Sequence, residues 1–127
     1  MNPYAVIEHI PSKWRSLNVA IYHAYGNSFR MNNKLNIKVV PISTINTRDA
    51  LWTTIWSTSW PLPGYQQKPK NEIIREVVTD VRLPEDFPFE PYCLLLEVFA
   101  NASDKKNDWY FDGIGITKND EVTVTAG

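Results

Sequence analysis

Cysteine, histidine and glycine are all scarce in this 127-residue chain, which has one Cys, two His and five Gly. Because Cys93 has no second cysteine to pair with, no internal disulfide can form, and the thiol content fits a reducing compartment. The glycines form no phosphate-cradling loop, and no His/Cys cluster has the spacing of a zinc site. We therefore expect no cofactor.

Basic charge is not in excess, since 13 Lys and Arg against 14 Asp and Glu leave a net charge of −1. Nucleic-acid binding by phosphate neutralisation and adhesion to anionic membranes are both disfavoured. No apolar run approaches the roughly 20 residues that a membrane helix needs. Residues 1–11 lack the basic-then-apolar pattern of a signal peptide. The sequence predicts a location in the cytoplasm or another reducing compartment, with no nucleic-acid or membrane partner.

Hydrophobic residues, at 43% of the chain, suffice to fill the core of a single domain spanning residues 1–127. Nine prolines divide the chain into short segments rich in Val, Ile, Thr and aromatics, which is typical of strands joined by loops. The most apolar segment, 92–100, suits a central strand. Strands are predicted at 4–10, 35–42, 51–60, 92–100, 109–117 and 121–125, the last two joined by a hairpin at Asn119-Asp120. The run 51–60 could instead be helical, with Leu51, Trp52, Ile55 and Trp56 on one buried stripe.

Two further segments, 13–25 and 71–82, fit a helix or a strand. In the first, Ser12 and Gly26 suit the caps of a helix, whereas the β-branched and aromatic residues slightly favour a strand. In the second, Ile and Val fall on one helical face but are β-branched. With both as strands, the chain is mostly β: an antiparallel β-sandwich or jelly-roll of about seven to eight short strands. The alternative is an α+β fold with one or two helices packed on an antiparallel sheet.

Tryptophan recurs through the predicted strand 51–60. Because side chains alternate along a strand, every second residue of this segment should project from the same face. The row is Trp52, Thr54, Trp56, Thr58 and Trp60. If exposed, its rings could stack on sugar rings; if buried, they form the core side of the strand. The glycan hypothesis takes its ligand-binding residues from this row and two other aromatics: Trp52, Trp56, Trp60, Tyr65 and Trp109.

Residues 109–116, WYFDGIGI, resemble the last core strand of jelly-roll carbohydrate-binding domains, although they lack the usual second acidic residue and no family is assigned. The resemblance implies a jelly-roll fold and sugar binding. Independently, Gly113 and Gly115 within a strand indicate a bulge or a close approach of another backbone.

Oxygen-bearing side chains between residues 101 and 112 are the kind that Ca²⁺ accepts. The weak metal candidates are Asp104, Asn107, Asp108 and Asp112. The segment lacks the spacing and closing Glu of an EF-hand, and Lys105 and Lys106 would stand where the cation sits. We predict no metal site.

Catalytic groups are few. A strand would point Glu8 away from its neighbour His9, and Cys93 lies in an apolar run that predicts a buried, inert thiol. An enzyme would need His9, His23 or Cys93 in a shared cleft. We predict that the protein is not an enzyme.

Two functions remain. The first is a non-catalytic binding domain that holds a glycan through surface aromatics. The alternative is a small structural or inhibitory accessory protein, of the kind viruses and phages encode, that acts through protein–protein contacts. Edge strands would also permit a homo-oligomer.

Overall fold

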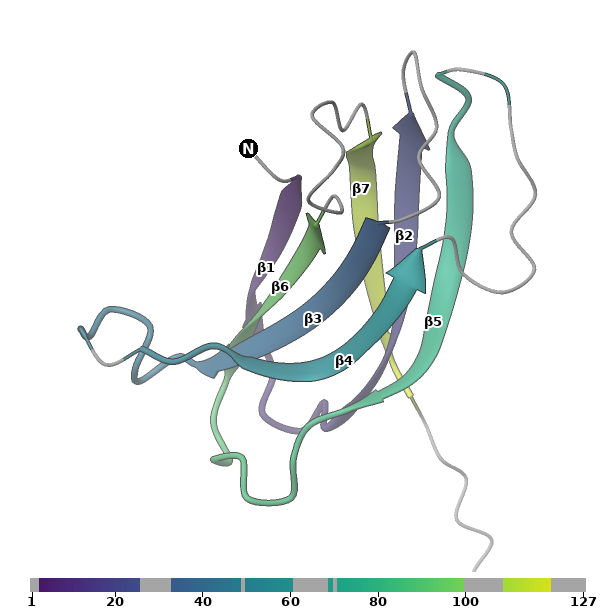
Figure 1. The fold of residues 1–127 in the computed structure, drawn as a ribbon. Helices are drawn as coiled ribbons and strands as arrows, with labels where there is room; N and C mark the ends of the chain where they lie inside the picture. The colour runs from purple at the N-terminus through teal and green to yellow at the C-terminus, as the bar shows by residue number, and fades with distance from the viewer. Residues whose placement is uncertain are drawn as a thin grey trace, which may run out of the picture.

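The computed structural model describes residues 3–25, 33–48, 50–60, 69, 71–99 and 109–119. Within these ranges the chain forms seven strands and no helix (Figure 1). The strands are β1 (Tyr4–Ile10), β2 (Ser16–Tyr25), β3 (Asn33–Pro41), β4 (Thr53–Trp60), β5 (Ile74–Arg82), β6 (Tyr92–Phe99) and β7 (Trp109–Lys118). All three ambiguous segments contain strands, so the mostly-β prediction is confirmed and the α+β alternative is wrong.

The strands form two antiparallel sheets that pack face to face as a β-sandwich (Figure 1). One sheet has the order β1-β6-β3-β4 and the other β5-β2-β7. Only the β3–β4 connection joins neighbours in one sheet, and every other connection crosses between the sheets. The apolar strand β6 lies between β1 and β3, which confirms its prediction as a central strand.

The core lies between the two sheets and is made by alternate residues of their inner strands. Residues on the opposite face of β3, such as Lys34 and Lys38, are exposed or half-buried. Each large apolar side chain removed from water stabilises the fold by roughly 1.5–3 kcal/mol. The fully buried apolar residues of β2, β3 and β6 include Leu17, Val19, Ile21, Leu35, Ile37, Val39, Leu94, Leu96 and Val98.

All four edge strands carry a bulge. Each bulge is one extra residue in the edge strand between two successive cross-strand pairs. β1 has one residue more than β6, β4 one more than β3, and β5 and β7 each one more than β2. The central β3–β6 pair runs without irregularity. Because a bulge bends and twists the strand that bears it, bulged edges pair poorly with a second sheet edge. The extra residue of β7 lies beside Gly113, which confirms the predicted bulge there.

The bulge in β5 explains why residues 71–82 resemble a helix. Leu17 pairs with Val81 and Val19 with Val78, so the extra residue sets two buried valines three positions apart. That spacing is the helical one, although the segment is a strand. Asp80, within the bulge, has a φ of 60°.

The bulge in β4 interrupts the Trp row. Ile37 pairs with Trp56, but the next residue, Lys38, pairs with Thr54, so Ile55 is the extra residue. Ile55 and Trp56 both pack against the core, whereas Thr54 is exposed beside Lys38. The prediction that the row from Trp52 to Trp60 shares one face is therefore wrong, because one inserted residue reverses the alternation.

Candidate functional site

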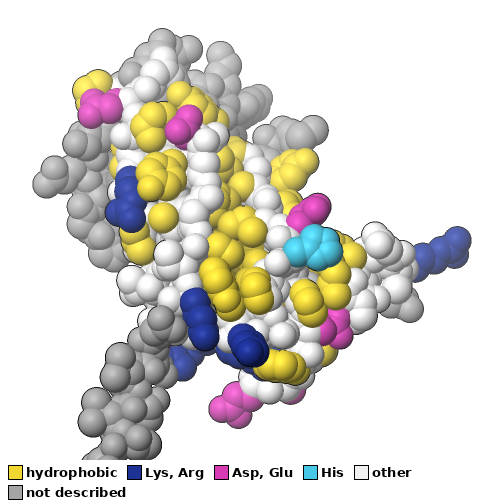
Figure 2. All heavy atoms as spheres, turned by 180° about the vertical axis from the view of Figure 1, so that it is seen from behind, with side chains coloured by type: hydrophobic (Ala, Val, Ile, Leu, Met, Phe, Trp, Pro, Cys, Tyr) yellow, Lys and Arg dark blue, Asp and Glu magenta, His cyan; other side chains and the backbone are white. Residues whose placement is uncertain are grey.

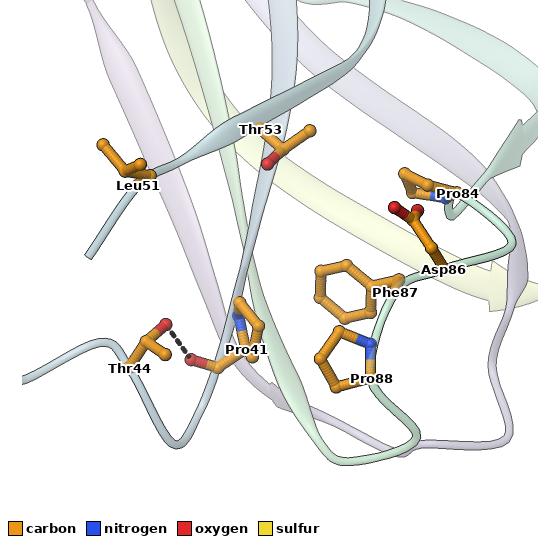
Figure 3. Close-up of a pocket in the computed structure, with 8 residues that line it drawn as sticks. All are labelled: Pro41, Thr44, Leu51, Thr53, Pro84, Asp86, Phe87 and Pro88. Carbon is orange, nitrogen blue, oxygen red and sulfur yellow. Dashed lines mark hydrogen bonds between the residues drawn. The ribbon is translucent and has the colours of Figure 1, made fainter. Parts of the chain in front are cut away.

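A hollow of about 310 Å³ lies at one end of the sandwich, between the β3–β4 connection and the β5–β6 loop (Figure 3). Leu51 and Thr53 line the hollow from the start of β4 and the residues before it, and the rings of Phe87 and Pro88 line it from the β5–β6 loop. The Asp86 carboxylate stands on the rim. The complete lining is Pro41, Thr44, Leu51, Thr53, Pro84, Asp86, Phe87 and Pro88.

Arg15, from the β1–β2 connection, holds the β5–β6 loop in place. Its guanidinium donates hydrogen bonds to the carbonyl oxygens of Pro84 at 3.1 Å, Phe87 at 3.0 Å and Pro88 at 3.2 Å. It also lies 5.9 Å from the centre of the Phe87 ring, within cation–π range. Since prolines fix φ and one planar cation spans three carbonyls, this wall of the hollow is preformed.

Phe87 packs edge-on against Tyr92, with ring centroids 5.7 Å apart. The Tyr92 hydroxyl donates a hydrogen bond to the Trp14 carbonyl oxygen, so this ring links the hollow to the β1–β2 connection. Burial raises the pKa of Tyr92, and the nearby positive charge of Arg15 opposes that rise only in part. The folded protein thus favours the neutral phenol.

Tyr92 should make the protein sensitive to alkali. Below about pH 10 the phenol is neutral in both states, so its contribution to stability is complete. Above that pH the unfolded chain ionises first, and the free energy of unfolding should fall as pH rises. Chemical denaturation between pH 7 and 11 should show this fall in the wild type and a weaker one in Tyr92→Phe. Equal slopes in the two proteins would contradict the assignment.

The β3–β4 connection is tied to the same loop. The Ser43 N–H donates to a Glu90 carboxylate oxygen at 2.7 Å, and the Ile42 N–H donates to the Pro91 carbonyl at 2.9 Å. Hydrogen bonding by the Ser43 side chain, and then by its backbone N–H, holds the pKa of Glu90 below its ordinary value. The β3–β4 connection and the β5–β6 loop therefore form one unit around the hollow.

This end of the sandwich combines apolar side chains with the polar groups of Thr44, Thr53 and Asp86, and its net charge is negative along the β5–β6 loop. Leu51 is 80% exposed, and Phe89, which follows Pro88, is 70% exposed. The loop from 83 to 91 carries Glu85, Asp86 and Glu90 and no Lys or Arg. Such an arrangement can bind a ligand that carries an apolar group next to a positive charge.

The structure separates the sequence-predicted ligand residues. Trp52 is half-buried just before β4, and Trp56 packs against the core. The side chains of Trp60 and Trp109, and all of Tyr65, lie outside the described residues, as does the predicted 119–125 hairpin beyond Asn119. A shared glycan platform of these residues stays a prediction.

Of the weak metal candidates, only Asp112 falls within the described residues, where it is the exposed extra residue of the β7 bulge. Asp104, Asn107 and Asp108 lie outside them. In the part of the chain that the structure describes, no group of three or more His, Cys, Asp or Glu could hold a metal ion.

His9 and Cys93 line a second hollow, of about 250 Å³, together with Glu8. The expectation that Glu8 and His9 point apart is wrong, because His9 lies in the β1 bulge with a φ of 59°. Cys93 is fully buried, as predicted. His23 is elsewhere, between the sheets, with its Nε2 2.8 Å from a Glu76 carboxylate oxygen. The three residues thus do not share one cleft.

Sequence reasoning missed the hollow around Phe87. The segment 84–91 is dense in proline, and that density indicates a rigid loop. What it does not indicate is the residue that holds the loop, because Arg15 is about 70 positions away.

No protein-family model matches this sequence, and none of the curated proteins is similar to it. Within the residues described, no helix has the length and apolar character to cross a membrane.

Proposed function

We propose that this protein is a non-catalytic binding domain that holds a protein partner at the hollow between Leu51 and Phe87. The observation that carries the proposal is a preformed hollow lined by proline rings and by Leu51, whose side chain is 80% exposed. Loops at the end of a sandwich are where such folds usually carry binding residues. Because Arg15 already fixes the loop, a partner would meet little ordering cost there.

The charge of the rim indicates the kind of partner. Asp86 lines the hollow and Glu85 is exposed beside it, whereas Arg48, the basic residue of the β3–β4 connection, does not line the hollow. A partner segment with an apolar side chain followed by Lys or Arg would fill the hollow and neutralise the rim. The partner's apolar side chain would lie against Leu51 and the proline rings.

Protein contact has more support than sugar stacking at this end. Phe87 lines the hollow but is only 9% exposed, so little of its ring is open for a sugar to stack on. Within β4, Trp56 is the only ring of the predicted row whose side chain the structure describes. It packs against the core. Leu51 also lines the hollow, and its exposed side chain suits an apolar protein surface.

Selection from a phage-displayed random peptide library tests the proposal. We expect enriched peptides to combine an apolar residue with a neighbouring Lys or Arg. A Leu51→Asp variant should bind a selected peptide at least about tenfold more weakly, measured by calorimetry, because the new carboxylate would be buried against an apolar side chain. Asp86→Asn should weaken the same peptide and lessen the salt dependence of its binding.

Val6→Asp is the matched control, since Val6 is also exposed, at 42%, but lies in β1 and does not line the hollow. It should bind the selected peptide as the wild type does. The proposal fails if no peptide is enriched, or if Leu51→Asp and Val6→Asp weaken binding to the same extent.

A further inference from the structure

The outer face of the β5-β2-β7 sheet carries a separate groove of about 210 Å³. The groove forms over Ala20 and Gly115, a cross-strand pair, because these residues have little or no side chain. A Cβ added to Gly115 would meet only the Ala20 Cβ, at 3.9 Å, so the space above the glycine is open. Seen from behind, hydrophobic side chains gather over the middle of the molecule, and Lys and Arg side chains lie at its side and lower edge (Figure 2).

Hydrogen-bonding groups surround this apolar floor. Arg75 donates from its Nε to the Tyr22 hydroxyl at 3.1 Å and lies 5.9 Å from the centre of that ring. This contact aligns the guanidinium beside the groove and leaves its terminal nitrogens as donors. Asn18 accepts a hydrogen bond from the Asp80 N–H through its Oδ1, so its amide nitrogen can still donate. Ile116 and Thr117, from β7, also line the groove.

The charge of Arg75 is not neutralised by the carboxylates near it. Asp80, in the same strand, accepts hydrogen bonds from Ser16 and Asn119 and pairs with Arg82 at 2.8 Å. Glu76 is turned to the inner face, where it binds His23. Across the described residues, Arg75 has Tyr22 as its hydrogen-bond partner and no carboxylate. A guanidinium in this state favours a ligand that brings its own carboxylate.

We infer that this groove binds the ring of an acidic sugar, with the carboxylate of a uronic acid against Arg75. A sugar ring has apolar C–H faces and a polar rim, which match the small apolar floor and the donors around it. The volume is below the roughly 300–1,000 Å³ of sites for drug-sized ligands, which suits one small ring. Tyr22 and Val77 would contact the ring from the β2 and β5 sides.

Titration of the ¹⁵N-labelled protein with trigalacturonic acid tests the inference. We expect amide shifts at Ala20, Tyr22 and Gly115, and binding in the millimolar range or tighter. The fully methyl-esterified trimer has the same rings without the charge, and it should bind at least about tenfold more weakly. Equal binding of acid and ester, shifts confined to other residues, or no binding of the acid would each overturn the inference.

Two variants remove different parts of the site. Arg75→Gln should weaken the acid at least about tenfold and leave the ester unchanged, whereas Gly115→Val should block both by filling the groove. Gly113→Ala is the control, because a Cβ there meets nothing within 4 Å and the residue does not line the groove. An Arg75→Gln variant that binds the acid normally would overturn the inference. Leu51→Asp should bind the acid as the wild type does, so this test is independent of the proposed protein partner.

Discussion

Replacing Arg15 by alanine should lower the free energy of unfolding by about 3 kcal/mol. A hydrogen bond to a charged group contributes roughly 1.5–3 kcal/mol, and the three bonds to Pro84, Phe87 and Pro88 share one guanidinium, so their contributions do not add fully. The loss also removes the cation–π contact with Phe87. Urea denaturation at pH 7 measures the change.

The same variant should loosen the binding end before it unfolds the protein. Hydrogen exchange at the Phe87 and Glu90 amides, which donate to the Pro84 and Pro88 carbonyls within the loop, should be faster in Arg15→Ala. Arg15→Lys should restore little stability, because an ammonium cannot span three carbonyls as a planar guanidinium does. The peptide selected by the wild type should then bind both variants more weakly.

Arg82→Ala supplies the comparison for an arginine on the surface. The side chains of Arg82 and its partner Asp80 are 50% and 52% exposed, and an exposed pair contributes about 0–1 kcal/mol. If Arg15→Ala costs no more than Arg82→Ala, or if exchange in the 83–91 loop is unchanged, Arg15 does not hold the loop.

The strands that sequence pattern predicts best are those without irregularities. Leu35, Ile37 and Val39 alternate with polar residues along β3, and the uninterrupted β3–β6 ladder preserves that alternation. β6 is recognisable by its apolar run, and most of its residues are buried. Period-two alternation therefore predicts the central strands of the sandwich better than its bulged edge strands.

Apart from the β7 bulge beside Gly113, the sequence pattern does not disclose the bulges. The extra residue in β4 moves Thr54 to the outer face, and the one in β5 sets Val78 and Val81 at a helical spacing. The one in β1 brings Glu8 and His9 to one hollow. None of these bulge residues is glycine, so the residue type that most often signals a bulge is missing.

The candidate site is hidden from the sequence for a different reason. Its lining comes from two connections that are separated along the chain, and Arg15 belongs to a third. Composition shows that 84–91 is a proline-rich loop, but only the fold brings Leu51 and Phe87 to the same hollow. The glycan hypothesis follows the most conspicuous residues, the tryptophans, and the structure turns Trp56 to the core.

Replacing His23 by leucine should destabilise the protein by about 3–5 kcal/mol, a larger loss than that expected for Arg15→Ala. His23 is fully buried, and its Nε2 lies 2.8 Å from a carboxylate oxygen of Glu76, whose side chain is 13% exposed. Removing the imidazole leaves that carboxylate between the sheets without its partner. An uncompensated buried charge destabilises the folded state strongly. Chemical denaturation at pH 7 gives the value for the single variant.

The double variant His23→Leu/Glu76→Leu separates that penalty from simple loss of packing. With both polar groups replaced by apolar side chains, no charge is left behind, and most of the lost stability should return. The two single changes should therefore be strongly non-additive, with a coupling energy of about 2 kcal/mol or more. Additive losses in the double variant would show that the two side chains act independently. In that case the cost of His23→Leu would come from its packing between the sheets, and Glu76 would tolerate the loss of its partner by turning toward solvent.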